Sequence, residues 1–89
     1  MLVIGLDLGR KSKHYAVGVD MAHQEVFSRK VKSSRDDLGR LLELADRYGG
    51  GGEIHVVMEA TGMSWFLPAV FFVNAGCRVK ADQAADFRG

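Results

Sequence analysis

Two acidic residues each come directly after an apolar run that is typical of a strand. Asp7 follows residues 2–6, and Glu59 follows residues 54–58. A carboxylate at the end of a buried strand is unfavourable unless a positive group lies beside it. If the two strands are neighbours, their two carboxylates would form half of a site for a divalent metal.

Carboxylate oxygens suit Mg²⁺ or Mn²⁺, because hard cations prefer oxygen ligands. Two such ions about 4 Å apart can activate a water and stabilise the leaving oxygen of a phosphodiester. Without the metals, like charges held that close would repel each other. Asp7 and Glu59 are therefore the candidate catalytic and metal-binding residues. The alternative for Asp7 is a structural role, as a turn residue that bonds its own backbone.

The composition is that of a globular protein. The 89 residues allow one small domain or part of a larger one, with 47% hydrophobic and 26% charged residues. The net charge of +1 does not by itself indicate nucleic-acid binding. Two local basic clusters could line a phosphate backbone, although a solvated surface is the commoner explanation. The first cluster, Arg10, Lys11 and Lys13, supplies the candidate nucleic-acid contacts, and the second is Arg29, Lys30, Lys32 and Arg35.

Other residue types exclude several kinds of site. The single cysteine, Cys77, excludes an intramolecular disulfide and a Cys-rich zinc site, and it fits a cytoplasmic protein. The apolar N-terminal stretch ends at Asp7 and is too short for a signal peptide or membrane span, so we expect no membrane partner. The histidines have no metal-ligand spacing on one element, and we expect surface or structural roles for His14, His23 and His55.

Three strands are predicted before the first helix. Residues 2–8 form a continuously apolar run, which indicates a strand buried on both faces. Residues 15–19 and 24–31 are the second and third strands. Short links between consecutive strands imply antiparallel hairpins.

A helix follows the third strand, with Ser33 or Ser34 as its cap and Asp36 and Asp37 near its positive end. Glycines at 49–52 end it. Its apolar residues recur on one helical face: Leu38, Leu41, Leu42, Ala45 and Tyr48.

The second half of the chain repeats a strand and a helix. The strand that ends at Glu59 leads into a turn at residues 60–62 and a second helix over residues 64–74. Gly76 is a natural stop for that helix. Residues 78–80 are short but typical of a strand.

The predicted order is three strands, helix, strand, helix, strand. A three-strand meander followed by βα units is typical of the α/β ribonuclease H-like fold with a mixed sheet. In that fold the first and fourth strands lie side by side at the centre of the sheet. This adjacency would bring Asp7 and Glu59 together.

The second predicted helix has almost no polar face, because residues 65–73 are apolar throughout. A helix that is apolar all round must be covered on both sides. The sheet covers one side, so a missing segment, a partner chain or another domain must cover the other. We therefore expect an incomplete domain that self-associates through Phe66 to Val73.

Three stretches resemble insertion sequence 110 family transposases. Residues 3–11 (Val-Ile-Gly-Leu-Asp-Leu-Gly-Arg-Lys) and 58–62 (Met-Glu-Ala-Thr-Gly) resemble the opening motifs of that family. Residues 75–89 resemble the segment that follows. The Glu-Ala-Thr-Gly element is fairly specific, whereas Asp-x-Gly after a strand is a weak signal alone.

The resemblance implies an N-terminal RuvC-like nuclease domain with an Asp-Glu-Asp-Asp tetrad, of which residues 1–89 are the N-terminal part. Asp7 would be the first acid and Glu59 the second. The third and fourth acids of the family lie downstream, in a Lys-Thr-Asp-x-x-Asp-like run that these residues do not contain. Asp82 and Asp86 have a different spacing and are not assigned to the tetrad.

The resemblance also implies the activity of the parent protein, which would recombine DNA with Mg²⁺ or Mn²⁺ and a structured guide RNA. The family has a catalytic serine in a C-terminal domain, for which Ser64 is not a candidate. Because half of the metal ligands would be absent, we expect the isolated chain to be inactive. The expected partners are DNA, guide RNA and further copies of the chain.

Two alternatives from other classes remain open. Actin-like and sugar-kinase ATPases share this fold and open with a strand, Asp-x-Gly and a phosphate-binding turn, which residues 2–12 also fit. Those turns favour small hydroxyl residues where this chain has Arg10 and Lys11, and the ATPases do not predict Glu59. The other alternative is a non-catalytic oligomerisation module in which both acids are structural.

Overall fold

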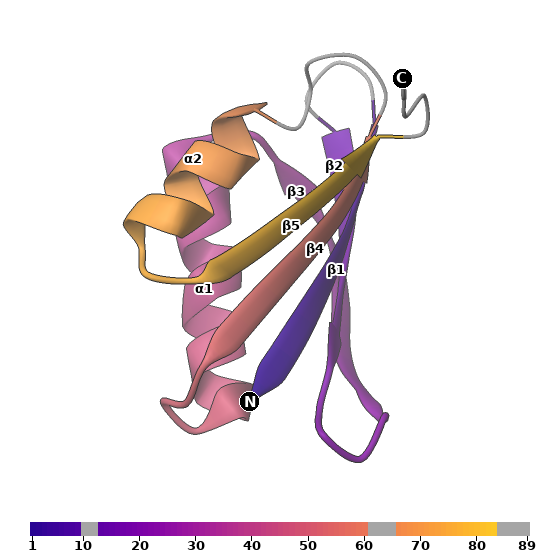
Figure 1. Cartoon of the computed structure of the whole chain (residues 1–89), viewed down its shortest axis with the longest axis vertical. Helices are drawn as coiled ribbons and strands as arrows, with labels where there is room; N and C mark the ends of the chain where they lie inside the picture. The colour runs from indigo at the N-terminus through magenta and orange to yellow at the C-terminus, as the bar shows by residue number, and fades with distance from the viewer. Residues whose placement is uncertain (10–12, 61–65, 84–89) are drawn as a thin grey trace.

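The computed structural model of the chain describes residues 1–9, 13–60 and 66–83, with the side chains of all of these except Ala60, Asp82 and Gln83. Within these residues the chain forms one sheet and two helices (Figure 1). The elements are β1 (Leu2–Leu8), β2 (Lys13–Val19), β3 (Glu25–Lys32), α1 (Arg35–Gly49), β4 (Ile54–Ala60), α2 (Phe66–Asn74) and β5 (Arg78–Gln83).

The sheet is mixed, with strand order β3-β2-β1-β4-β5. The pairs β1–β2 and β2–β3 are antiparallel, and the pairs β1–β4 and β4–β5 are parallel. A three-strand meander with β1 and β4 adjacent at the centre is the ribonuclease H-like arrangement. The predicted fold class is therefore confirmed.

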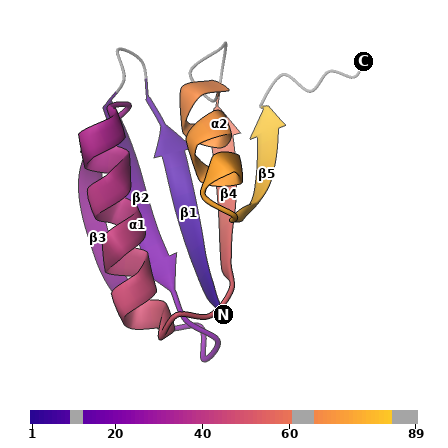
Figure 2. The ribbon, with the colours of Figure 1, turned by 90° about the vertical axis from the view of Figure 1, so that its left-hand side faces the viewer.

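Both helices lie on the same face of the sheet (Figures 1 and 2). The core forms between the helices and that face, because alternate residues of each strand point toward them. Its fully buried members include Leu2, Ile4, Leu41, Val56, Met58 and Phe72. We call the other side of the sheet the open face, and the positions on it include Val3, Gly5, Asp7, Tyr15, Val17, Lys30, His55, Val57, Glu59 and Lys80.

The prediction that residues 2–8 are buried on both faces is wrong for the part of the chain that the structure describes. Leu6 and Leu8 are buried, but Asp7 between them is exposed. The reason is that α1 and α2 pack on one side only. Since Asp7 faces solvent on the open face, its charge carries no burial penalty.

The first helix begins and ends where the sequence predicts. Ser34 is the N-cap, and its hydroxyl accepts a hydrogen bond from the Asp37 N–H at 3.1 Å. Gly50 ends the helix in the left-handed region with φ 65°, and its N–H donates to the Asp46 carbonyl oxygen. These two ends fix how α1 lies across the sheet.

Several predicted boundaries differ from the structure. β2 begins at Lys13 and not at residue 15. β3 spans Glu25–Lys32, so both of its ends lie one residue later than in the predicted strand at 24–31. The predicted turn at 60–62 and the start of the second helix at Ser64 fall largely outside the described residues. β5 extends to Gln83, beyond the predicted strand at residues 78–80, and Asp82 is part of it.

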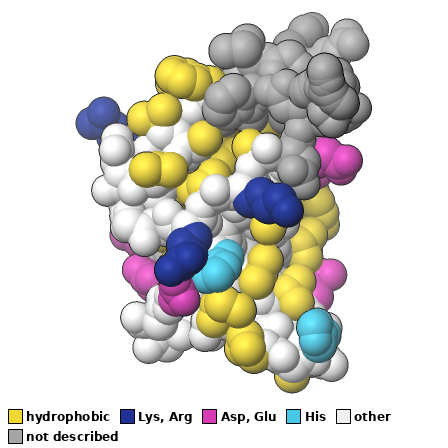
Figure 3. All heavy atoms as spheres, viewed as in Figure 1, with side chains coloured by type: hydrophobic (Ala, Val, Ile, Leu, Met, Phe, Trp, Pro, Cys, Tyr) yellow, Lys and Arg dark blue, Asp and Glu magenta, His cyan; other side chains and the backbone are white. Residues whose placement is uncertain are grey.

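α2 is apolar on its outer side as well as its inner side. Pro68 and Phe72 are buried, whereas Leu67 is 61% exposed and Val73 is 57% exposed. Figure 3 shows hydrophobic side chains gathered over this helix. No helix in the described parts of the chain is long and apolar enough to cross a membrane.

Candidate metal and nucleic-acid site

The structure brings Asp7 and Glu59 together. They are direct partners in the parallel β1–β4 pair, on strands that lie about 4.8 Å apart. Both are exposed and on the open face. The main prediction from the sequence, that these two carboxylates share one end of the sheet, therefore agrees with the geometry.

A third acidic residue is aligned with this pair. Asp82 is the partner of Glu59 in the parallel β4–β5 pair, so acidic residues occupy one row across β1, β4 and β5. The side chain of Asp82 lies outside the described ones. Among the described residues, no group of three or more His, Cys, Asp or Glu side chains could hold a metal.

The donor set fits a hard divalent cation as far as the described residues go. Two carboxylates offer oxygen ligands and negative charge, which Mg²⁺ and Mn²⁺ prefer. Asp7 and Glu59 are thus the residues that would hold such an ion.

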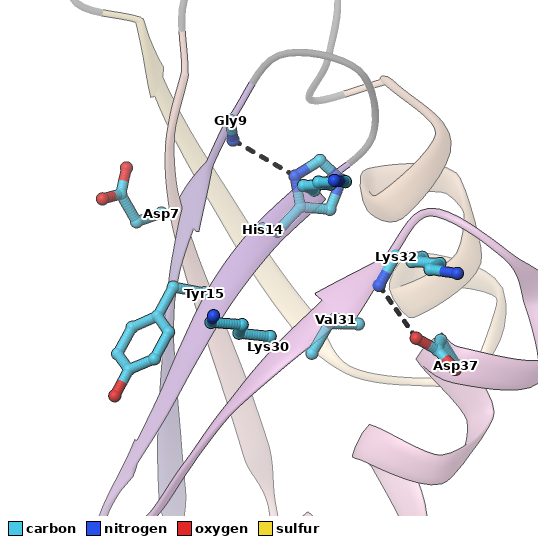
Figure 4. Close-up of a pocket in the computed structure, with 9 residues that line it drawn as sticks. Asp7, Gly9, His14, Tyr15, Lys30, Val31, Lys32 and Asp37 are labelled. Carbon is cyan, nitrogen blue, oxygen red and sulfur yellow. Dashed lines mark hydrogen bonds between the residues drawn. The ribbon is translucent and has the colours of Figure 1, made fainter.

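Two hollows meet at Asp7 and Tyr15. One, of about 410 Å³, lies over the open face and is lined by Gly5, Val57 and Glu59 together with Asp7 and Tyr15. The other, of about 500 Å³, curves around the end of the sheet. Besides Asp7 and Tyr15, its lining residues are Gly9, Lys13, His14, Lys30, Val31, Lys32 and Asp37 (Figure 4).

His14 ties the end of β1 to the start of α1. Its ring is 4% exposed, Nδ1 accepts a hydrogen bond from the Gly9 N–H at 3.2 Å, and Nε2 lies within hydrogen-bond distance of the Ser33 hydroxyl. Accepting at Nδ1 requires the neutral ring with its proton on Nε2. Burial is the main cause of its lowered pKa. The expected structural role for this histidine is confirmed.

Position 9 has no room for a side chain, because the backbone of Lys13 lies close to it. An added Cβ would lie 2.3 Å from the Lys13 carbonyl oxygen, to which the Gly9 N–H also donates at 3.1 Å. Gly9 lies two residues after Asp7, so these contacts hold the strand end that carries the carboxylate.

Of the three predicted nucleic-acid contacts, the structure describes one. Arg10 and Lys11 fall outside the described residues, and Lys13 is exposed beside the second hollow. Sequence reasoning did not assign Tyr15, Lys30 or Lys32 to the site. Residue types alone do not reveal this grouping, because it depends on the strand register, which pairs Lys13 with Lys32 and Tyr15 with both Lys30 and Asp7.

The other perturbed groups lie away from the carboxylate pair. Glu53, just before β4, contacts His55 at 3.4 Å and Arg78 at 2.7 Å. The neighbouring His55 ring is the main cause of the lowered pKa of Glu53, followed by the hydrogen bond that Arg78 donates. Burial raises the pKa of the thiol of Cys77, which packs against the core. These groups join β4 to β5 at the opposite end of the strands from Glu59.

The strand order and the central parallel pair define a ribonuclease H-like domain, with Asp7 and Glu59 aligned at one end of that pair. Residues 4–85 match the sequence pattern of the DEDD family of insertion sequence 110, described as a transposase. The chain belongs to this transposase family. No curated protein matches it in sequence. Membership favours the transposase interpretation over the ATPase and the non-catalytic module.

We predict that His14 makes the stability of the chain fall with acidity. Its folded-state pKa is lowered from the model-peptide value of 6.5, so the unfolded chain binds its proton first as the pH falls. The stabilisation is complete well above pH 6.5 and is lost progressively as the pH falls below that value, by at most about 1.4 kcal/mol per pH unit. Urea unfolding measured from pH 7.5 to pH 5 gives this slope.

His14→Gln should be less stable at pH 7.5 and should show a flatter slope, because the substituted residue no longer titrates. His23→Asn is the matched control, since His23 is exposed and has a positive φ of 63° that asparagine tolerates. Equal slopes in the wild type and His14→Gln would contradict this account.

Proposed function

We propose that this chain supplies the first two metal-binding carboxylates of a transposase that cleaves and rejoins DNA with Mg²⁺ or Mn²⁺. The observation that carries the proposal is the alignment of Asp7 with Glu59 on the open face. Membership in the transposase family supports DNA as the substrate. In this proposal both residues are catalytic because they hold the metal.

The bound metal would supply Lewis-acid activation of a phosphodiester and of the attacking water. Asp7 and Glu59 would fix the position of the ion, and the rigid β1–β4 pair would keep them fixed. Their exposure on the open face leaves room for a phosphate beside them. In the absence of metal, the two carboxylates repel each other.

We also propose that Arg10, Lys11 and Lys13 contact DNA next to the carboxylates. Lys13 is the member of this set in the described residues, and it is exposed at the rim of the second hollow with Asp7. Lysine and arginine bind phosphates without reading the sequence. These residues would therefore position the backbone and not select the target.

Two further parts of the proposal rest on the family. The complete enzyme would work with a guide RNA, which would select the DNA target. The 89 residues alone would not cleave DNA, because the described residues offer no group of three metal ligands. Asp7 and Glu59 would thus need acids from outside the described residues.

We propose that a second copy of the chain covers the outer side of α2. The side chains that support this are Leu67, Val70 and Val73, all exposed on one helix. A hollow of about 510 Å³ beside them, between α1 and α2, is lined in part by Leu38 and Phe71. An exposed apolar patch of this kind favours association.

We predict that the chain binds Mn²⁺ through Asp7 and Glu59. Calorimetric titration should show saturable binding, and Glu59→Gln should abolish it because a neutral amide replaces one of two charged ligands. Glu43→Gln is the matched control, since Glu43 is exposed on α1, away from the carboxylate pair. Equal loss in both variants, or saturable binding that survives Glu59→Gln, would contradict a shared site.

We predict concentration-dependent self-association through α2. Sedimentation velocity of the wild-type chain should show a larger species that grows with concentration. Leu67→Gln should shift the chain to monomer, whereas Met21→Gln, at an equally exposed apolar residue between β2 and β3, should not. A monomer at all concentrations would exclude a second copy as the partner of α2.

A further inference from the structure

A tyrosine and a lysine extend the acidic row across the sheet. Tyr15 is the partner of Asp7 in the β1–β2 pair, and Lys30 is the partner of Tyr15 in the β2–β3 pair. Neighbouring strands lie about 4.8 Å apart, so Lys30 is about 10 Å from Asp7 across the sheet. Figure 4 shows the Asp7 and Tyr15 side chains on the same side of the sheet, with Lys30 beside Tyr15.

Two more lysines lie at the end of the same sheet. Lys13 and Lys32 are direct cross-strand partners, and both line the second hollow with Asp7, Tyr15 and Lys30. We call Lys13, Tyr15, Lys30 and Lys32 the lysine–tyrosine surface.

Folding does not account for this surface. Like charges directly opposite each other on paired strands are destabilising, and Lys13 faces Lys32 in this way. Lysine on an edge strand can discourage aggregation, which would explain Lys30 and Lys32 on β3. It does not explain Lys13, because β2 is paired on both sides. Tyr15 is 45% exposed, with its ring outside the core.

The lysine charges of this surface are also free of ion pairs within the described part of the chain. The nearby acid that could neutralise them, Asp37, is engaged elsewhere. Its carboxylate accepts the Lys32 backbone N–H at 3.0 Å and pairs with Arg40 at 3.4 Å. Three ammonium groups that line the second hollow therefore remain available to an anionic ligand.

We infer that the lysine–tyrosine surface binds unpaired, single-stranded DNA beside the carboxylate pair. Tyr15 stacks on one base, and Lys13, Lys30 and Lys32 contact the adjoining phosphates. An exposed aromatic ring flanked by positive charge is the arrangement that binds single strands, because every base offers a flat face to stack on. The choice of DNA rests on the proposed function, whereas the surface itself rests on the register and exposure of these residues.

Unpaired DNA fits better than a duplex for a geometric reason. In a duplex the bases are stacked on each other, and their faces are not accessible to Tyr15. A splayed or displaced strand exposes them. The strand would cross β2 and approach Asp7 and Glu59, so the surface would hold unpaired DNA next to the proposed cleavage site.

The test is fluorescence anisotropy of the 89-residue chain with a labelled 12-nucleotide oligothymidylate in EDTA. Tyr15→Thr keeps a strand-forming residue and should weaken binding at least about fivefold, the lower range for loss of one stacked base. Tyr15→Phe should keep the affinity. Lys30→Gln and Lys32→Gln should each reduce the salt dependence of log K by about 0.7, as for one phosphate contact with a single strand. Arg47→Gln on α1 should leave both values unchanged.

Working in EDTA separates this inference from the metal site. The double variant Asp7→Asn, Glu59→Gln should still bind the oligomer in EDTA, whatever the outcome of the Mn²⁺ titration. Unchanged binding by Tyr15→Thr, or a loss with Arg47→Gln as large as with Lys30→Gln, would overturn the inference. Tighter binding of the matching duplex, or of an oligouridylate, would overturn the assignment to unpaired DNA.

Discussion

The parallel pairing of β1 with β4 holds the two halves of the sheet together and sets the position of both carboxylates. It joins two segments that are separated in sequence by β2, β3 and α1, and the Leu2 N–H donates to the Glu53 carbonyl oxygen at 3.0 Å where the pairing starts. Its register is set by the core, because Ile4 faces Val56 and Leu6 faces Met58 on the buried side. A slip by one residue would turn Asp7 toward the core, where its charge would be unpaired. The same burial that folds the sheet therefore sets Asp7 beside Glu59.

As a result, one face of the sheet forms the core and the other is exposed to solvent. α1 and α2 cover one face and enclose the core, while the open face presents charged and aromatic residues to solvent. Along one row of that face, negative charge at Glu59 and Asp7 gives way to Tyr15 and then to Lys30. A metal would bind at the acidic end of the row and a phosphate backbone at the basic end. Both ligands of the proposed reaction would then bind along one exposed row of the sheet.

Much of this could be predicted from the sequence because local signals and global fold agree. The apolar run before Asp7, the Ser34 cap and the glycines after α1 each define an element, and the element order then implies that β1 and β4 are adjacent. The prediction that residues 2–8 are buried on both faces was wrong. A continuously apolar strand implied cover on both faces, yet periodicity along β1 cannot show on which side the helices pack. The extension of β5, and with it the register of Asp82, also needed three-dimensional pairing, since residues 78–83 alternate too weakly to set a strand end.

The grouping of the basic residues also could not be predicted without the three-dimensional pairing of the strands. Composition could indicate two lysine- and arginine-rich clusters, but only the β2–β3 register shows that Lys13 meets Lys32 and that Lys30 lies beside Tyr15. His14 is similar, because its contacts with Gly9 and Ser33 join residues from two separate connections. Long-range register, and not residue type, converts these scattered residues into a site.

Whether Asp7 and Glu59 act as one pair can be measured with a double-mutant cycle of Asp7→Asn and Glu59→Gln, in which urea unfolding in EDTA at low salt gives the stability of each variant. If the two carboxylates are neighbours, each substitution should raise the free energy of unfolding, and the two gains should fall short of additive by about 0.5 kcal/mol. Saturating Mn²⁺ should reverse the order and make the wild type the most stable. Additive effects in EDTA, or a wild type that Mn²⁺ does not stabilise, would contradict the account.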